Sequence, residues 1–280
     1  MPKVSVLMPV YNVKEEYLRE AIESILNQTY TDFEFIILDD CSSTDMESIV
    51  KSYKDNRIKF YRNEQNLGIA KSRNKLMEIA QGEYAALMDN DDISLPQRLE
   101  KQVAFLDNNK EISIVSAAYE IFPNKTIIKH PLKVGYLDLY RGCLLAHPLA
   151  MFRLDDMKKY NLQYDNSFIC SQDYELWSRA IKYLKMANLP EVLLKYRVLE
   201  ESITHKKAAL AFEEDTKIKQ KMLEFLSTDE EIQNKIKNLY FPVIKHKKNS
   251  FLQNIFSIRN IENHKILIIF GIKTKLRRNK

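Results

Sequence analysis

The stretch "GEYAALMDNDD", residues 82–92, decides how this chain is interpreted. A short apolar run, residues 84–88, is typical of a buried strand, and three carboxylates and one amide follow it at once. Like charges this close repel one another, so the cluster is destabilising unless water or a cation neutralises it. Asp89 and Asp91 are therefore candidate ligands of a hard divalent ion, Mn²⁺ or Mg²⁺, and the alternative is a solvated acidic turn.

The residues before this stretch alternate between strand and helix patterns. The strand-like runs are 4–8, 35–38 and 58–61, and apolar residues at helical spacing occupy 18–26, 46–53 and 69–80. This order predicts an α/β fold with a mostly parallel sheet flanked by helices. Further on, we expect a strand at 112–119, helices at 136–150 and 171–186, and one or two amphipathic helices over 206–240.

Polar residues follow each predicted strand of this first part. Ligands of parallel α/β sheets bind outside the carboxyl ends of the strands, so these side chains should converge on one crevice. The segment "PVYNVKEE", residues 9–16, stands where a dinucleotide-binding chain would carry GxGxxG, so the crevice is not an ordinary NAD site. The residues expected there are Tyr11, Asn12, Asp39, Asp40, Asp89 and Asp91.

Six ordered motifs together resemble the family 2 glycosyltransferases, which have the nucleotide-diphospho-sugar transferase fold called GT-A. The matching segments are "VSVLMPVYN" (4–12), "AIESILNQTYTDFEFIILDDCSSTD" (21–45), "NLGIAKSRN" (66–74), "GEYAALMDNDDISLPQRLEKQ" (82–102), "HPLAMFR" (147–153) and "SQDYELWSRA" (171–180). The resemblance implies a catalytic domain over 1–205, with a nucleotide-binding half at 1–110 and an acceptor half at 111–205. Residues 206–280 would form a helical extension with a basic tail.

The resemblance also implies roles for single residues. Asp89 is expected near the ribose or sugar, Asp91 on the metal, and Asp173 as the base on the acceptor side. The residues implied to hold the nucleotide are Pro9, Tyr11, Asn12, Asp39, Asp40 and Arg73, and those implied as walls of the donor or acceptor site are His147, Gln172, Trp177 and Arg197.

Each of these residues also has a purely structural interpretation. Asp173 could cap a helix, Arg73 could lie on a helix surface, and His147 before Pro148 could be a buried, hydrogen-bonded histidine.

The chain departs from the family pattern at three positions. Gln172 replaces an acidic residue and Leu199 replaces a histidine, for which His205 is a candidate substitute. Cys41 replaces a glycine, so we expect that turn to avoid positive φ.

The implied reaction is inverting, metal-dependent transfer of Gal, GlcNAc, GalNAc or Glc from a nucleotide-diphospho-sugar, with UDP as the expected nucleotide. The acceptor would be a hydroxyl of a cell-surface glycan such as lipooligosaccharide, capsule or a lipid-linked oligosaccharide. A cation would stabilise the leaving diphosphate and a carboxylate would remove the acceptor proton. The alternatives are a nucleotidyltransferase and a non-catalytic sugar-nucleotide-binding scaffold.

The charge of the chain is unevenly distributed. Residues 245–280 hold ten Lys or Arg and one acidic residue, a charge of +9, which leaves 33 basic and 37 acidic residues elsewhere, a charge of −4. Such a tail favours an anionic membrane surface, while no nucleic-acid-binding motif accompanies it; a packed hairpin with a strand at 266–270 and a turn at Gly271 is the third interpretation.

Three features bear on the compartment. The three cysteines form no CxxC pair, which indicates free thiols in a reducing compartment. We expect no secretory leader and no spanning segment. The expected location is therefore cytoplasmic, at the periphery of the inner membrane on its cytoplasmic face.

Overall fold

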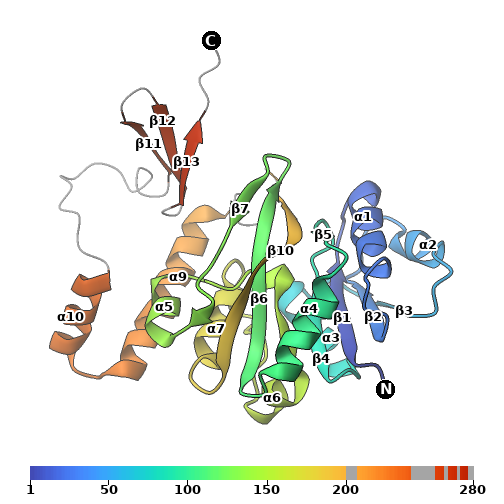
Figure 1. Cartoon of the computed structure of the whole chain (residues 1–280), viewed down its shortest axis with the longest axis horizontal. Coiled ribbons are helices and arrows are strands. Elements are labelled where there is room, and N and C mark those ends of the chain that lie inside the picture. Colours follow the sequence, from blue (N-terminus) through green and yellow to red (C-terminus); the bar gives the residue numbers. More distant parts are fainter. Residues whose placement is uncertain (200–206, 241–255, 262–263, 270–271, 277–280) are drawn as a thin grey trace. The chain divides into compact units, whose positions relative to one another are not determined.

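The computed structural model describes residues 1–199, 207–240, 256–261, 264–269 and 272–276. It divides into two compact units, Met1–Gln233 and Asn234–Lys280. The first unit contains one large mixed sheet with helices on both sides, which confirms the predicted α/β fold (Figure 1).

The N-terminal part of the sheet is parallel, with the strand order β3-β2-β1-β4. The strands are β1 (Val4–Val10), β2 (Phe33–Asp39), β3 (Ile58–Arg62) and β4 (Tyr84–Leu87), and the helices between and after them are α1 (Glu15–Leu26), α2 (Met46–Lys51), α3 (Ile69–Ile79) and α4 (Arg98–Asn108). Val10 pairs with Asp39, and Leu7 pairs with Leu87. The register therefore brings the polar residues that follow β1, β2 and β4 to one edge of the sheet.

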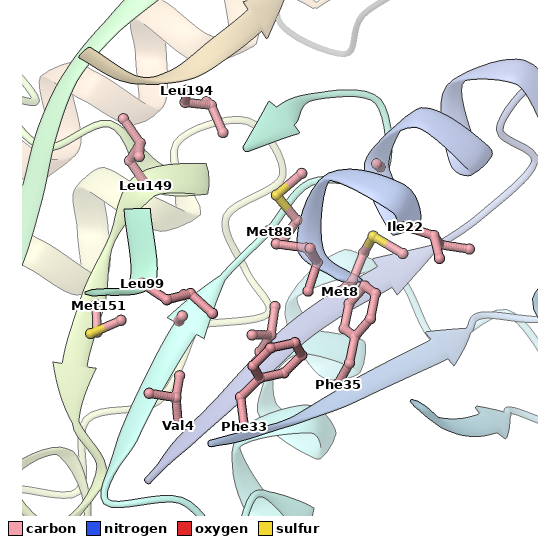
Figure 2. Packing of buried hydrophobic residues seen from close by; sticks show 14 of the residues in the cluster. Val4, Met8, Ile22, Phe33, Phe35, Met88, Leu99, Leu149, Met151 and Leu194 are labelled. Atoms are coloured by element: carbon pink, nitrogen blue, oxygen red, sulfur yellow. The ribbon is translucent and has the colours of Figure 1, made fainter. Parts of the chain in front are cut away.

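The core of this unit lies on both faces of β1 and β2. Every residue of these two strands is buried, as expected for parallel strands that are covered by helices on each side. In the close-up, Met8 of β1 and Phe35 of β2 lie near Ile22 of α1, and Met88 lies above them at the end of β4 (Figure 2). This packing fixes the strand ends that carry the polar residues.

The second part of the sheet joins the first through a short antiparallel strand. β9 (Met151–Arg153) pairs antiparallel with both β4 and β6 (Ile112–Phe122), and β6 pairs parallel with β10 (Lys185–Arg197). The shorter elements of this region are β5 (Ile93–Ser94), β7 (Thr126–Ile128), β8 (Lys133–Val134), α5 (Tyr136–Arg141), η1 (His147–Leu149), α6 (Leu154–Lys159) and α7 (Gln172–Ala180).

Two predicted helices are shorter in the structure than in the sequence. The helix expected over 136–150 ends at Arg141, and after Gly142 the chain forms only the three-residue turn η1 around Pro148. The helix expected over 171–186 ends at Ala180, because residues from Lys185 onward belong to β10. In both cases pairing or packing elsewhere in the chain overrides local helical spacing.

Two helices follow the sheet, in agreement with the amphipathic pattern of 206–240. They are α9 (Ala208–Leu226) and α10 (Glu230–Tyr240). In the second unit, β11 (Phe256–Ile261), β12 (His264–Ile269) and β13 (Ile272–Leu276) form an antiparallel sheet. The predicted hairpin is thus present as β12 and β13, and its turn residue Gly271 lies outside the described residues.

Candidate active site at the carboxyl edge of the sheet

The acidic loop after β4 lies beside the end of β1. The run 84–88 is buried, whereas Asp89, Asn90 and Asp91 are partly exposed. The Asn90 side-chain amide donates a hydrogen bond of 3.0 Å to the carbonyl of Pro9. The structure thus brings the motifs around residues 9 and 89 together, as the sequence predicted.

Arg73 connects this loop to a distant helix. From α3, its guanidinium donates to Asp89 Oδ1 at 3.1 Å and to Gln172 Oε1 at 3.3 Å, and it lies 5.5 Å from the ring centre of Tyr164. Its side chain is only 13% exposed, so the interpretation of Arg73 as a surface helix residue is wrong. Arg73 holds the start of α7 against the end of β4.

Asp173 is the first acidic residue of α7 and is half-buried in the site. Ser171 occupies the N-cap position, so Asp173 is not the cap of this helix. Burial raises the pKa of the Asp173 carboxyl and the charge of Asp89 raises it further, whereas backbone N–H groups and Arg73 act in the opposite direction. A carboxyl whose pKa is raised from its ordinary value is a stronger base once it is ionised.

Asp91 and Asp92 share a region where negative charge is unfavourable. Burial and the charge of Asp89 raise the pKa of Asp91 to about 6, and burial raises the pKa of Asp92 well above its ordinary value. Asp92 Oδ1 accepts the backbone N–H of Arg197 at 2.8 Å, while its buried Oδ2 has no hydrogen-bond partner among the described residues.

The donor set at this loop fits a divalent cation. Mg²⁺ is usually held by one or two carboxylates together with substrate phosphates, and Asp89 and Asp91 supply two carboxylates that crowd each other. No group of three or more potential ligands among His, Cys, Asp and Glu occurs in the described residues, so the remaining ligands would come from the diphosphate and water.

Arg197 is tied to the same loop from the end of β10. Its Nε donates to the carbonyl of Asp91 at 2.7 Å, it pairs with Glu20, and its guanidinium lies 4.2 Å from the ring centre of Tyr17. Arg197 therefore anchors the backbone of the acidic loop. Leu199, two residues on, is partly buried, and His205 lies outside the described residues.

Two charged residues near the acidic loop were not predicted from the sequence. Asp92 is almost fully buried, and Arg98 of α4 is fully buried and donates to the carbonyl of Leu87 at 2.6 Å. Burial lowers the pKa of Arg98 to about 9, although the charges of Asp92 and Asp89 oppose this shift. The available signal was a charged residue at a core-facing position of the amphipathic pattern 98–106.

The carboxylates of Asp39 and Asp40 accept most of their hydrogen bonds from other groups of the protein. Both residues are buried at the end of β2. Asp39 accepts hydrogen bonds from Ser42 and Arg62, and Asp40 accepts from the Asn63 amide and the backbone N–H groups of residues 67 and 68. Because a carboxylate has about four acceptor positions, Oδ2 of each residue keeps one position that these hydrogen bonds do not use.

Tyr11, Asn12 and Cys41 form the rim on this side of the edge. Tyr11 is exposed, and Asn12 Oδ1 accepts the Ser43 N–H at 2.8 Å beside an open hollow lined by residues of α1 and α2. Cys41 has φ of 63°, so the expectation that the turn avoids positive φ is wrong. The glycine-type conformation of the turn is kept, at the steric penalty that any side chain has there.

His147 and Trp177 lie behind Asp89. His147 is buried with Nε2 2.9 Å from the Tyr164 hydroxyl, and its Nδ1 lies 3.9 Å from Asp89 Oδ1 with no hydrogen-bond partner among the described residues. Burial lowers the pKa of His147 well below its ordinary value, so the imidazole is neutral. Trp177 is fully buried 6.3 Å from the imidazole, ring centre to ring centre, and supports His147 without lining the site itself.

The comparisons with known proteins agree with this arrangement. The family model described as glycosyl transferase family 2 matches residues 5–181. A protein of Methanocaldococcus jannaschii named as a glycosyltransferase is 45% identical over 208 residues, which cover 70% of this chain and 71% of the relative. The Escherichia coli enzyme named UDP-Glc:alpha-D-GlcNAc-diphosphoundecaprenol beta-1,3-glucosyltransferase WfgD is 31% identical over 209 residues, which cover 73% of this chain and 80% of the enzyme.

Solved structures show the same fold at low identity. TarS 1-349 of S. aureus in complex with UDP-GlcNAc has a TM-score of 0.70 and 21% identity, and the match covers 85% of this chain and 71% of that one. The match spans 42% of the longer TarS chain. The Pyrobaculum calidifontis mannosyltransferase PcManGT in complex with GDP-Man and Mn2+ has a TM-score of 0.60 and 17% identity, over 86% of this chain and 81% of that one.

The sheet order thus matches the GT-A fold of these glycosyltransferase structures. More specifically, the chain belongs to glycosyl transferase family 2.

Proposed function

We propose that the protein is an inverting, metal-dependent glycosyltransferase that moves a hexose from a UDP-sugar to a hydroxyl of a lipid-linked glycan. The observation that supports this most is the Arg73 guanidinium, which bonds to Asp89 at 3.1 Å and to Gln172 at 3.3 Å. One side chain thereby links the candidate donor carboxylate to the residue before the candidate base, Asp173. A donor and an acceptor that meet at this bridge would have their reacting atoms close together.

The family and the names of its members support the donor and acceptor classes. WfgD is named for UDP-Glc and for a GlcNAc-diphosphoundecaprenol acceptor, and TarS is described with UDP-GlcNAc. Among the four sugars considered, Gal, GlcNAc, GalNAc and Glc, these names favour Glc and GlcNAc. The membership of glycosyl transferase family 2 argues against the nucleotidyltransferase and the non-catalytic scaffold.

In the proposed donor site, the residues at the ends of β1, β2 and β4 each bind a different part of the nucleotide sugar. The exposed ring of Tyr11, with Pro9 and Asn12, would hold the base and ribose, and the free acceptor position of Asp40, with Asp39, would hold the uracil. Asp89 would face the ribose or sugar, with Arg73 keeping its carboxylate in place. Asp91 and Asp89 would hold Mn²⁺ or Mg²⁺, which when bound stabilises the negative charge of the leaving diphosphate.

On the acceptor side, Asp173 would remove the proton of the attacking hydroxyl. Burial raises its pKa, so the ionised form is a stronger base than an exposed aspartate. Attack on the face opposite the diphosphate inverts the anomeric centre in one displacement. Gln172 and Arg197 do not contact the reacting atoms in this proposal; they hold Arg73 and the acidic loop.

The proposed place of action is the cytoplasmic face of the inner membrane. No helix in the described part of the chain is long and apolar enough to cross a bilayer. The attachment proposed here is electrostatic, through the charge of +9 carried by residues 245–280.

The substitution Asp173→Asn tests the proposed base. Asparagine keeps the size of the side chain but cannot accept the proton, so transfer should fall by about 10²–10⁴-fold. The affinity for UDP in the presence of Mn²⁺ should stay near that of the wild type, and both quantities should be measured on one preparation. A panel of UDP-sugars with a GlcNAc-α-diphosphate on a short alkyl chain supplies the substrates, and an Asp173→Asn enzyme with full activity would overturn the assignment.

A further inference from the structure

Glu214 of α9 is a buried carboxylate that lies beyond the segment matched by the family model. It is 3% exposed. Its Oε1 accepts the backbone N–H of Ile169 at 2.7 Å, and its Oε2 accepts those of Cys170 and Ser171, both at 2.8 Å. Three successive N–H groups that converge on one carboxylate form an anion-binding concavity, which the chain fills with its own side chain.

These three residues lead directly into α7. Ser171 is the N-cap of this helix, and its hydroxyl also donates to the carbonyl of Ala211 at 3.4 Å. α7 and α9 pack against each other (Figure 1). The start of α7 is therefore held from one side by the first turns of α9.

From the other side, the same turn is held by the acidic loop. The Gln172 amide donates to the carbonyl of Ile169 at 2.7 Å, and its Oε1 accepts from Arg73, which also donates to Asp89. A continuous chain of hydrogen bonds thus runs from Glu214 to Asp89, and Asp173 follows directly after Gln172, which is part of this chain.

We propose that Glu214 is a positioning residue for the acceptor reaction: it fixes the turn 169–171 and thereby the direction of the Asp173 carboxylate. The inference rests on the proposed function, because it requires Asp173 to be the base. It extends the functional site into α9, a helix that contributes no residue to the six sequence motifs.

The chemistry of the turn requires a carboxylate at this position. Only an acceptor-only group can receive three N–H donors on two atoms, and a glutamine of the same size would turn its own N–H donors toward at least one of them. A buried N–H without an acceptor is unfavourable, so the turn would rearrange. A displacement of about 1 Å at a reacting group is enough to reduce a rate by about 10²-fold.

The test compares Glu214→Gln with Glu213→Gln in the full chain. Glu213 is the adjacent residue of α9, but its side chain is 61% exposed and pairs with Lys217 on the same helix. Glu214→Gln should reduce transfer from the UDP-sugar to the GlcNAc-α-diphosphate probe by about 10–100-fold. Its affinity for UDP with Mn²⁺ should be unchanged, its amides at 169–171 should exchange hydrogen faster, and Glu213→Gln should match the wild type in all three measurements.

A double variant separates positioning from a general loss of structure. If Glu214 acts through Asp173, adding Glu214→Gln to Asp173→Asn should cause no further loss of transfer. Additive losses, an equal loss of UDP affinity, or transfer rates that match Glu213→Gln would each overturn the inference. The proposed function fails in a different way: the wild type would show no transfer with any UDP-sugar, or Asp173→Asn would remain fully active.

Discussion

At the scale of single residues, Asp91 carries a carboxyl whose ionisation opposes folding. Burial and the charge of Asp89 raise its pKa to about 6 in the folded protein, compared with about 3.9 in an unfolded chain. The folded state therefore favours the protonated form. This contribution to stability is complete below about pH 4 and is lost as the pH rises through 6.

We expect Asp91→Asn to stabilise the metal-free protein at pH 7.5. The amide stays neutral, so the variant avoids a penalty of about 1–2 kcal/mol, after allowing for the partial exposure of the side chain. At pH 4 the variant and the wild type should differ little. Urea unfolding in a chelator at both pH values measures the effect, and a difference that is independent of pH would show that ionisation is not its source.

Removal of the same carboxylate should abolish turnover and weaken the binding of UDP that depends on the metal. Asp91→Ala should stop turnover and weaken UDP affinity in Mn²⁺ by at least about tenfold, since even outer partners of metal ligands are worth about 10–100-fold in metal affinity. UDP affinity in a chelator should hardly change. Asp155→Ala, at an exposed position of α6, is the control, and an Asp91→Ala protein with unchanged UDP affinity and turnover would reject the metal assignment.

The predictable residues are those that lie in contiguous motifs at strand ends. Asp89 and Asp91 could be placed in one crevice from the sequence because the order of strands and helices fixes that edge, whereas Arg73, which lies within α3, was expected there only from the family resemblance. Asp92 and Glu214 could not be placed, because each bonds to backbone N–H groups that are distant in sequence, residue 197 for Asp92 and residue 169 for Glu214. At Cys41 the residue type suggested the wrong φ, since the hydrogen bonds on either side of the turn impose its conformation.

At the scale of elements, the turn between α3 and β4 depends on Gly82. A Cβ at this position would lie 2.6 Å from the Ser5 backbone nitrogen and 2.8 Å from the Val4 carbonyl carbon. Gly82→Ala should therefore lower the free energy of unfolding by about 1–3 kcal/mol, as overpacking typically does. Gly142→Ala, where nothing lies within 4 Å, should be nearly neutral in the same thermal unfolding experiment; equal effects at both sites would contradict the steric explanation.

The elements that the sequence predicted are those that are long or clearly periodic. The runs that became β1, β2, β3 and β4 were recognisable because each is an apolar stretch bounded by turn residues. The two- and three-residue strands β5, β8 and β9 carry no period of their own and exist only through their partners. β10 was missed as well, since Pro190 lies within it, and its pairing with β6 shifts register around that residue.

At the scale of the whole molecule, the basic tail distinguishes the last residues from the rest. We expect truncation before Lys245 to release the protein from anionic liposomes and to leave the slow hydrolysis of the donor largely intact. Added salt should have a similar effect, because exposed charges are screened within about 8–10 Å at moderate ionic strength. Sedimentation with liposomes measures the bound fraction, and binding that persists after truncation and in high salt would contradict the electrostatic attachment.

The structure also divides the chain at this scale. The compact first unit continues to Gln233, and the catalytic domain that the family resemblance implies over 1–205 remains a prediction. The last of the sequence motifs ends at residue 180. The buried carboxylate of Glu214, which lies after it, nevertheless bonds to residues 170 and 171 within that part of the chain. The assignment of 1–110 to the donor and 111–205 to the acceptor remains a prediction.

The hydrogen bonds between α9 and the start of α7 also restrict how such enzymes can be recombined. A chimera of two relatives could be joined at residue 181, where the segment matched by the family model ends. A chimera joined there would combine the residue 169–171 turn of one parent with the α9 of another. Both segments therefore have to come from the same parent protein. A crossover after Gln233 meets this condition, because it leaves the residue 169–171 turn and Glu214 on the same side of the junction.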